Sequence, residues 1–162
     1  IAAARLYRSF IEGGVGAEYA YGNRFFRALE RDEELVTFRH DGERCILIEL
    51  PLDRPVIGVR RVARRLLGLG IRPVLAHPER LAEFLADLIR IRSWLEAGWF
   101  FQLNLPSLEE AHGREACSLA RDLVRRNQYT FLGSDLHRPG ELDLLRRAHG
   151  TYRTLTREEA RP

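Results

Sequence analysis

An aspartate and a histidine near the C-terminal end of the chain have the spacing of metal ligands. Asp135 and His137 follow the apolar run 129–132 and lie two residues apart. In a strand, side chains at i and i+2 point to the same side, so we expect these two to converge on one point. A second apolar run, 72–75, ends near His77. Histidine and carboxylate groups at two equivalent strand ends predict a site for a divalent metal.

The length and composition indicate one globular domain spanning 1–162. The chain has 162 residues, of which 45% are hydrophobic and 30% charged. It contains no apolar stretch of the roughly 20 residues that a membrane span needs, and its start does not resemble a signal peptide. We therefore expect a cytoplasmic protein without membrane insertion. The chain has no Met and opens like the middle of a helix, so we expect a segment upstream of residue 1.

The basic residues and cysteines exclude several kinds of chemistry. All 26 basic residues are arginine, which excludes Schiff-base lysines and the lysine of a phosphate-binding P-loop. The net charge is +3, but the arginines are scattered along the chain and give nucleic acid binding little support. Cys45 and Cys117 have no CxxC spacing, which favours buried free thiols in a reducing compartment.

Apolar patterns that alternate between helix and strand predict an α/β fold. The strand-length runs are nearly continuous, which is typical of a parallel sheet covered by helices. A helix and a hairpin with a turn at Asp41-Gly42 are expected within 25–43, and a last helix after Gly140. The predicted helices lie within 59–67, 81–95 and 116–124, and the predicted strands at 15–19, 45–50, 73–76, 99–103 and 129–132.

Polar residues stand where these predicted strands end. Ligands and catalytic groups gather at the carboxyl ends of parallel strands, so these side chains are expected at one edge of the sheet. Core packing alone rarely places such a group at the end of every strand. The residues concerned are Glu18, Glu49, His77, Gln102, Asn104, Asp135 and His137.

The ordered motifs resemble the PHP (polymerase and histidinol phosphatase) superfamily. The likeness is greatest to its bacterial manganese-dependent protein tyrosine phosphatases of capsule and exopolysaccharide operons, and it covers nearly the whole chain. The motifs are Gly16-Ala17-Glu18, Ile48-Glu49-Leu50-Pro51, Ala76-His77-Pro78-Glu79-Arg80, Gln102-Leu103-Asn104 with Ser107-Leu108 and Gly113, and Ser134-Asp135-Leu136-His137.

The resemblance implies a distorted (β/α) barrel that holds up to three divalent metals. By motif, Glu18 is implied to bridge metals, and His77, Asp135 and His137 to ligate them. Arg80 is implied to hold the phosphoryl oxygens, and Arg138, which follows His137 at once, is a further candidate for this role. Manganese is the implied metal, although iron and zinc accept the same ligands. The implied substrate is a phosphotyrosine protein, such as a bacterial tyrosine kinase, and the sequence leaves oligomeric state open, homo-oligomer included.

The chain also departs from the family pattern. Family members begin with a His-x-His strand and further histidines, and no His-x-His pair is present here. The N-terminal strands are therefore expected to be missing, either because the chain is cropped or because it is a decayed, non-catalytic copy that serves as a binding or regulatory protein. A small-molecule phosphatase of the histidinol phosphatase kind is a further alternative.

Each candidate also has a purely structural interpretation. His77 could be a core histidine, Asp135 a helix cap, Glu18 a partner of an arginine, and Arg80 a surface residue beside Glu79 in the first turn of a helix. His112, His40 and His149 are interpreted as loop or exposed residues, and Trp94 and Trp99 as packing residues.

Overall fold

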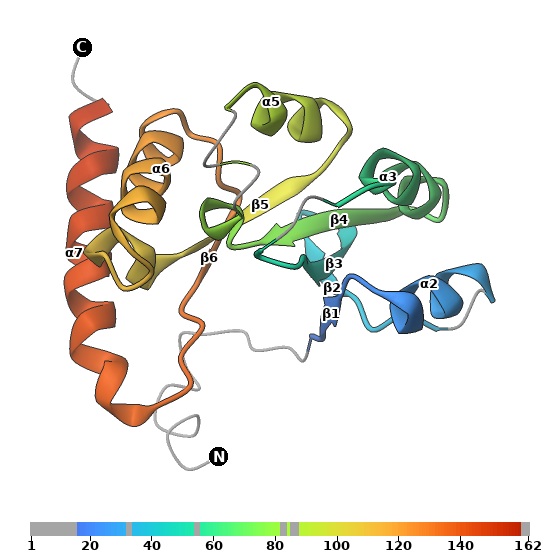
Figure 1. Ribbon diagram of the computed structural model, residues 1–162, viewed down its shortest axis with the longest axis horizontal. Coiled ribbons are helices and arrows are strands. Elements are labelled where there is room, and N and C mark those ends of the chain that lie inside the picture. Colours follow the sequence, from blue (N-terminus) through green and yellow to red (C-terminus); the bar gives the residue numbers. More distant parts are fainter. Residues whose placement is uncertain (1–15, 32–33, 54–55, 82–83, 85–87, 160–162) are drawn as a thin grey trace.

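The computed structural model describes residues 16–31, 34–53, 56–81, 84 and 88–159, and Figure 1 shows their arrangement. Strands and helices alternate along these residues, as the sequence predicts. In chain order they are β1 (Glu18–Ala20), α2 (Asn23–Glu30), β2 (Phe38–His40), β3 (Glu43–Glu49), α3 (Val59–Gly68), β4 (Ile71–Ala76), η1 (Pro78–Arg80), α5 (Leu88–Glu96), β5 (Phe100–Asn104), η2 (Leu105–Glu109), α6 (Arg114–Arg125), β6 (Phe131–Gly133), η3 (Pro139–Glu141) and α7 (Leu142–Glu159).

The strands form one sheet in the order β1-β3-β4-β5-β6, in which all neighbours are parallel. Strand β2 is the exception, because it returns antiparallel along β3 after the Asp41-Gly42 turn, as the hairpin prediction requires. The α/β class with a mostly parallel sheet is therefore confirmed. Within the described residues the sheet is open and does not close into a barrel. The predicted strand at 15–19 begins three residues later, and Val15 lies outside the described residues.

One face of the sheet is covered by helices and holds the main hydrophobic core. Arginines occupy the outer side of α3, and Val62, Ala63 and Leu66 on its other side are buried. This spacing is that of an amphipathic helix packed on a sheet. A second, smaller core joins β5, η2, α6 and α7 around Leu103 and Ala148. Figure 1 shows α6 and α7 side by side at one end of the sheet.

The predicted helix at 81–95 is described only in part. Helix α5 covers Leu88–Glu96, and residues 82–83 and 85–87 lie outside the described residues. Trp94 and Trp99 are buried and their ring centroids lie 5.0 Å apart, which confirms their packing role. Cys45 and Cys117 are buried free thiols, also as predicted. No helix among the described residues is long and apolar enough to cross a membrane.

The other face of the sheet carries a half-buried aromatic cluster and, at its carboxyl edge, polar residues. His40 of β2 packs on Phe131 of β6 with ring centroids 4.6 Å apart, and Phe38 packs on the same ring at 5.4 Å. Strands β2 and β6 are not sheet neighbours, so the sheet must curl to bring them together. The expectation that His40 is exposed is wrong, because its ring is half-buried in this cluster.

Candidate metal centre

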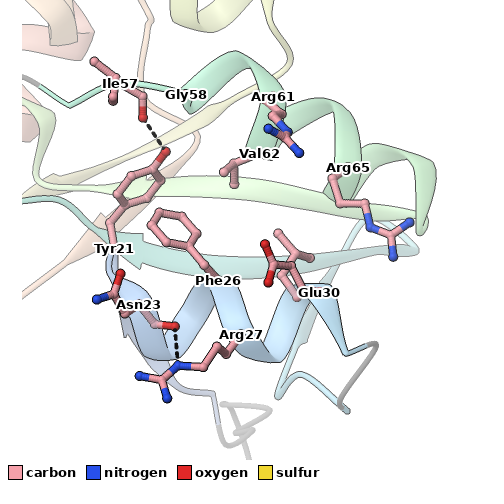
Figure 2. Close-up of a pocket in the computed structure, with 11 residues that line it drawn as sticks. Tyr21, Asn23, Phe26, Arg27, Glu30, Ile57, Gly58, Arg61, Val62 and Arg65 are labelled. Carbon is pink, nitrogen blue, oxygen red and sulfur yellow. Dashed lines mark hydrogen bonds between the residues drawn. The ribbon is translucent and has the colours of Figure 1, made fainter.

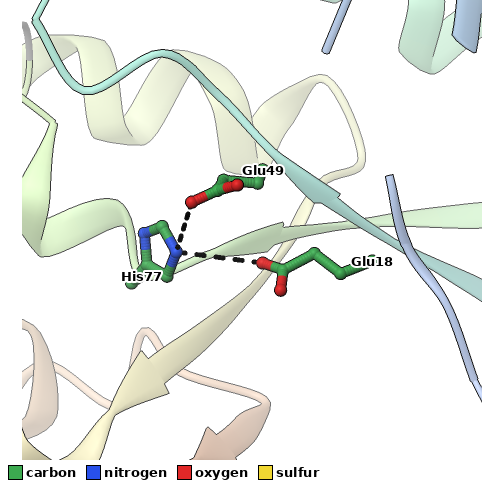
Figure 3. Close-up of side chains that lie close together, drawn as sticks. All are labelled: Glu18, Glu49 and His77. Carbon is green, nitrogen blue, oxygen red and sulfur yellow. Dashed lines mark ion pairs between the residues drawn. The ribbon is translucent and has the colours of Figure 1, made fainter. Parts of the chain in front are cut away.

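Three side chains from three neighbouring strand ends converge in the structure. His77 Nε2 lies 3.4 Å from Glu49 Oε1 and 3.8 Å from Glu18 Oε1. One ligand atom from each residue lies within 4.8 Å of the others, as a shared metal ion requires. Figure 3 shows both carboxylates pointing toward the same edge of the imidazole. The imidazole is buried, whereas the carboxylates are about two-fifths exposed.

Strand register explains why the two carboxylates meet. Glu18 of β1 is paired with Leu47 of β3, and Glu49 lies two residues beyond Leu47 on the same strand. Side chains two residues apart share a face, so Glu18 and Glu49 are diagonal neighbours on one side of the sheet. The hydrogen bonding between β1 and β3 continues one residue past the end of β1, because the Tyr21 amide donates to the Glu49 carbonyl at 2.8 Å.

His77 joins this face because its backbone leaves the strand conformation. Strand β4 ends at Ala76, and a regular strand would turn the next side chain to the opposite face. His77 instead has φ 33° and ψ 56°, a left-handed conformation that is uncommon for a residue with a side chain. Its amide still donates to the Gln102 carbonyl at 2.9 Å. Such backbone strain is concentrated at functional sites.

The electrostatics of the three groups suit a bound cation. Burial, together with the negative charges of Glu49 and Asp135, raises the pKa of Glu18. Burial and the nearby Arg80 charge lower the pKa of His77 to about 4, so the imidazole is neutral near pH 7. A neutral imidazole keeps a nitrogen lone pair for a metal, and Nε2, the ring nitrogen that faces both carboxylates, is placed to offer it. Two carboxylates and one imidazole therefore fit a divalent cation.

A second polar group lies at the ends of β5 and β6. Arg80 Nη1 donates to Asp135 Oδ2 at 2.9 Å, and Asn104 Nδ2 donates to the same oxygen at 3.3 Å. His137 Nε2 lies 3.1 Å from Asp135 Oδ1. The Asp135 carboxylate is thus surrounded by nitrogen atoms, and its charge also acts on Glu18 and His77.

The structure corrects how Asp135 and His137 come together. Strand β6 ends at Gly133, and Asp135 has φ 45°, which is incompatible with the predicted continuation of the strand. The pair meets through a loop instead, and the His137 ring is 78% exposed. Glu141 Oε2 holds this loop by accepting from the amides of His137 and Arg138 at 3.1 and 3.3 Å.

Glu79 lies in the first turn of the short helix η1, as its structural interpretation expects, and its side chain is fully buried. Its Oε1 accepts from the Asn104 amide at 3.1 Å and from Ser107 Oγ at 2.9 Å, and its Oε2 accepts from the Tyr129 hydroxyl at 3.0 Å. Burial raises the pKa of Glu79 to about 7. Through these hydrogen bonds Glu79 links the end of β5, the η2 segment that follows β5 and the segment that precedes β6. His112 Nδ1 lies 3.1 Å from Ser107 Oγ and extends the network outward.

Of the sequence candidates, the structure brings Glu18 and His77 into one cluster and places Asp135, His137 and Arg80 in the adjoining one. Arg138 is exposed in the loop that follows β6. Glu49 completes the first cluster, although the sequence motif did not single it out as a ligand. Its signal was its place at a strand end on the same face as Glu18. The role of Glu79 had no sequence signal, because nothing in the sequence shows that this glutamate is buried.

A parallel sheet with nitrogen and oxygen donors gathered at its carboxyl edge defines an α/β protein with a candidate metal centre. The chain belongs to the capsular polysaccharide synthesis family CpsB/CapC, whose sequence profile matches residues 4–144. The family resemblance drawn from the sequence motifs is thereby confirmed.

A solved structure supports the fold. It comes from work on YwqE of Bacillus subtilis and CpsB of Streptococcus pneumoniae, described as unique metal-dependent tyrosine phosphatases. The superposition has a TM-score of 0.67 and 24% sequence identity, and it covers 96% of this chain and 69% of that chain. A comparison with curated proteins found no significant match.

Proposed function

We propose that this chain is a metal-dependent phosphotyrosine phosphatase of capsular polysaccharide synthesis. The observation that carries the proposal is the convergence of Glu18, Glu49 and His77 next to Arg80 and Asp135. Family membership supports the capsule pathway, and the structurally similar proteins are metal-dependent tyrosine phosphatases. A phosphotyrosine protein of that pathway, such as a bacterial tyrosine kinase, is the substrate that we propose, and the cytoplasm is the proposed location.

The residues present can divide the work between metal binding and phosphate binding. Glu18, Glu49 and His77 would hold a divalent ion, with Asp135 and His137 as further ligands from the adjoining cluster. Such an ion lowers the pKa of a bound water and stabilises the charge that develops on a transferring phosphoryl group. Manganese is the ion we propose, and mixed imidazole and carboxylate ligands also accept iron or zinc.

Arg80 is placed to bind the phosphoryl group. A guanidinium has five N–H donors, and the contact with Asp135 engages it through Nη1. The remaining donors form a planar fork that suits phosphoryl oxygens. The charge on Arg80 lies within electrostatic range of Glu18 and His77, so a phosphate bound to it would lie beside the proposed metal ligands.

The test is hydrolysis of a phosphotyrosine peptide by this chain, and by a form extended upstream, with manganese added. We expect release of phosphate that EDTA abolishes and manganese restores, and its loss in His77→Ala and Asp135→Ala. Histidinol phosphate serves as the small-molecule comparison. Full activity in both variants, or preference for histidinol phosphate, would refute the proposal. Tight manganese binding without turnover in the extended form would favour a non-catalytic member of the family.

A further inference from the structure

A groove lies between α2 and α3 on the helix-covered face of the sheet, and its Tyr21 end is close to the strand ends that carry the candidate metal centre. Its volume is about 640 Å³, and Figure 2 shows the side chains that line it. Buried Val62 and Leu29 and half-buried Phe26 form an apolar floor. This groove belongs to the helix layer, so none of its lining residues is among the proposed metal or phosphate ligands.

The groove is connected to the metal centre through the backbone. Tyr21, which lines one end of the groove, donates its amide to the carbonyl of Glu49, one of the proposed ligands. Its hydroxyl donates to the Ile57 carbonyl at 2.9 Å and so joins the chain segments that follow β1 and β3. Burial raises the pKa of Tyr21 to about 12, so this hydroxyl keeps its proton. A peptide held at the metal centre and extending past the ends of β1 and β3 would therefore approach the Tyr21 end of the groove.

The rim of the groove carries more positive than negative side chains. Arg27 and Glu30 of α2 and Arg61 and Arg65 of α3 line it, which gives a net charge of +2. Arg61 and Arg65 are four residues apart, so they lie on one side of α3 and face the groove together. All four charged residues are exposed, and a ligand would not have to displace buried groups to reach them.

We propose that this groove binds an acidic segment next to the phosphotyrosine of a protein substrate, with an apolar side chain of that segment on the floor. The inference rests on the proposed phosphatase function and adds substrate selectivity to it. A small phosphate ester would occupy the metal centre alone and gain nothing from the groove. An acidic peptide would occupy both, because the rim and the peptide carry complementary charges.

The test compares phosphotyrosine peptides of one length whose flanking residues are acidic, neutral or basic, with p-nitrophenyl phosphate as the substrate without flanks. Exposed ion pairs are worth about 0.2–1 kcal/mol each, so we expect kcat/KM for the acidic peptide to exceed the neutral one about 5- to 10-fold at low salt. This preference should shrink as salt is raised.

Arg61→Glu should abolish the acidic preference and leave the hydrolysis of p-nitrophenyl phosphate unchanged. Arg64→Glu is the matched control, because Arg64 lies on the same helix, is exposed and does not line the groove. Equal rates on acidic and neutral peptides, or the same loss in both variants, would overturn the inference while p-nitrophenyl phosphate turnover upholds the phosphatase. Failure to hydrolyse p-nitrophenyl phosphate with manganese would refute the phosphatase itself.

A different occupant would give a different pattern. If the groove binds a second copy of the chain, Arg61→Glu should change the sedimentation of the protein alone and leave the peptide preference as it was. This outcome would also overturn the inference. Sedimentation that is unchanged, combined with a lost acidic preference, is the result that supports it.

Discussion

The two halves of the site differ in how their charges are balanced. At the ends of β1, β3 and β4, the Glu18 and Glu49 carboxylates face a neutral imidazole. At the ends of β5 and β6, the Asp135 carboxylate already has Arg80 and the Asn104 amide as partners. The first half needs a positive charge from outside the protein, whereas the second half is balanced by the protein itself. We therefore expect the first half to govern metal affinity, with a smaller contribution from Asp135 and His137, and Arg80 of the second half to govern phosphate binding.

Removal of a ligand from the first half should have the largest effect. In Glu49→Gln we expect both manganese affinity and kcat/KM to fall more than about 100-fold, because residues that merely orient ligands are already worth about 10–100-fold. Calorimetric titration and phosphate release measure the two quantities. Glu43→Gln, at the opposite end of β3, is the control with the same charge change. Unchanged manganese affinity in Glu49→Gln would show that this half is not the metal centre.

Replacement of Arg80 should distinguish the roles of the two halves, because it should lower kcat/KM without lowering manganese affinity. Loss of one preorganised donor to developing negative charge typically costs about 10²–10³ in rate, so we expect roughly a 100-fold fall in kcat/KM for Arg80→Met. Manganese affinity should stay the same or become tighter, because Asp135 loses a competing cation. A fall in manganese affinity as large as that in Glu49→Gln would mean that the halves do not act separately.

The two halves of the site also differ in how much of their structure the sequence predicts. Apolar runs and strand ends were enough to predict the parallel sheet and to place Glu18 and His77 at one edge, because these follow from periodicity. The left-handed backbone at His77 and Asp135 has no such signal. Neither residue is glycine, so the surrounding tertiary structure must impose the conformation. The assumption that Asp135 continues a strand fails for this reason.

Burial of polar groups is the other property that local sequence does not reveal. Glu79 reads as a favourable first-turn carboxylate, yet it is fully buried. Its burial depends on Ser107 and Tyr129, which are far away in the chain and supply hydrogen bonds that make a buried carboxylate tolerable. Only the packed fold brings these three residues together.

Stability of the metal-free protein should depend on pH through Glu79 and His77 in opposite directions. Burial raises the pKa of Glu79 from 4.5 to about 7, so its stabilising contribution is present below pH 4.5 and is lost as the pH rises to 7. Burial lowers the pKa of His77 from 6.5 to about 4, so its contribution is present above pH 6.5 and is lost as the pH falls to 4. The two trends should nearly cancel in the unaltered chain.

Single variants should reveal each trend in chemical denaturation with EDTA present. Glu79→Gln should lose stability as the pH falls from 6.5 to 4.5, and His77→Gln should gain stability over the same range. A pKa change of one unit corresponds to about 1.4 kcal/mol, so each trend amounts to ~3 kcal/mol at most. Equal pH slopes in both variants would contradict the burial of one of these groups.

The smallest effect is expected for Arg138, the second candidate for phosphate binding. Its backbone is held by Glu141, but the residue is exposed, so any contact with phosphate is screened by water. An exposed ion pair is worth about 0.2–1 kcal/mol, and Arg138→Ala should raise KM less than about fivefold with kcat unchanged. Arg146→Ala on α7 is the control, because its Nη1 pairs with Asp143 at 3.0 Å, away from the site residues. A loss near 100-fold would instead make Arg138 the main phosphate ligand, and Arg80 would then serve chiefly to hold Asp135.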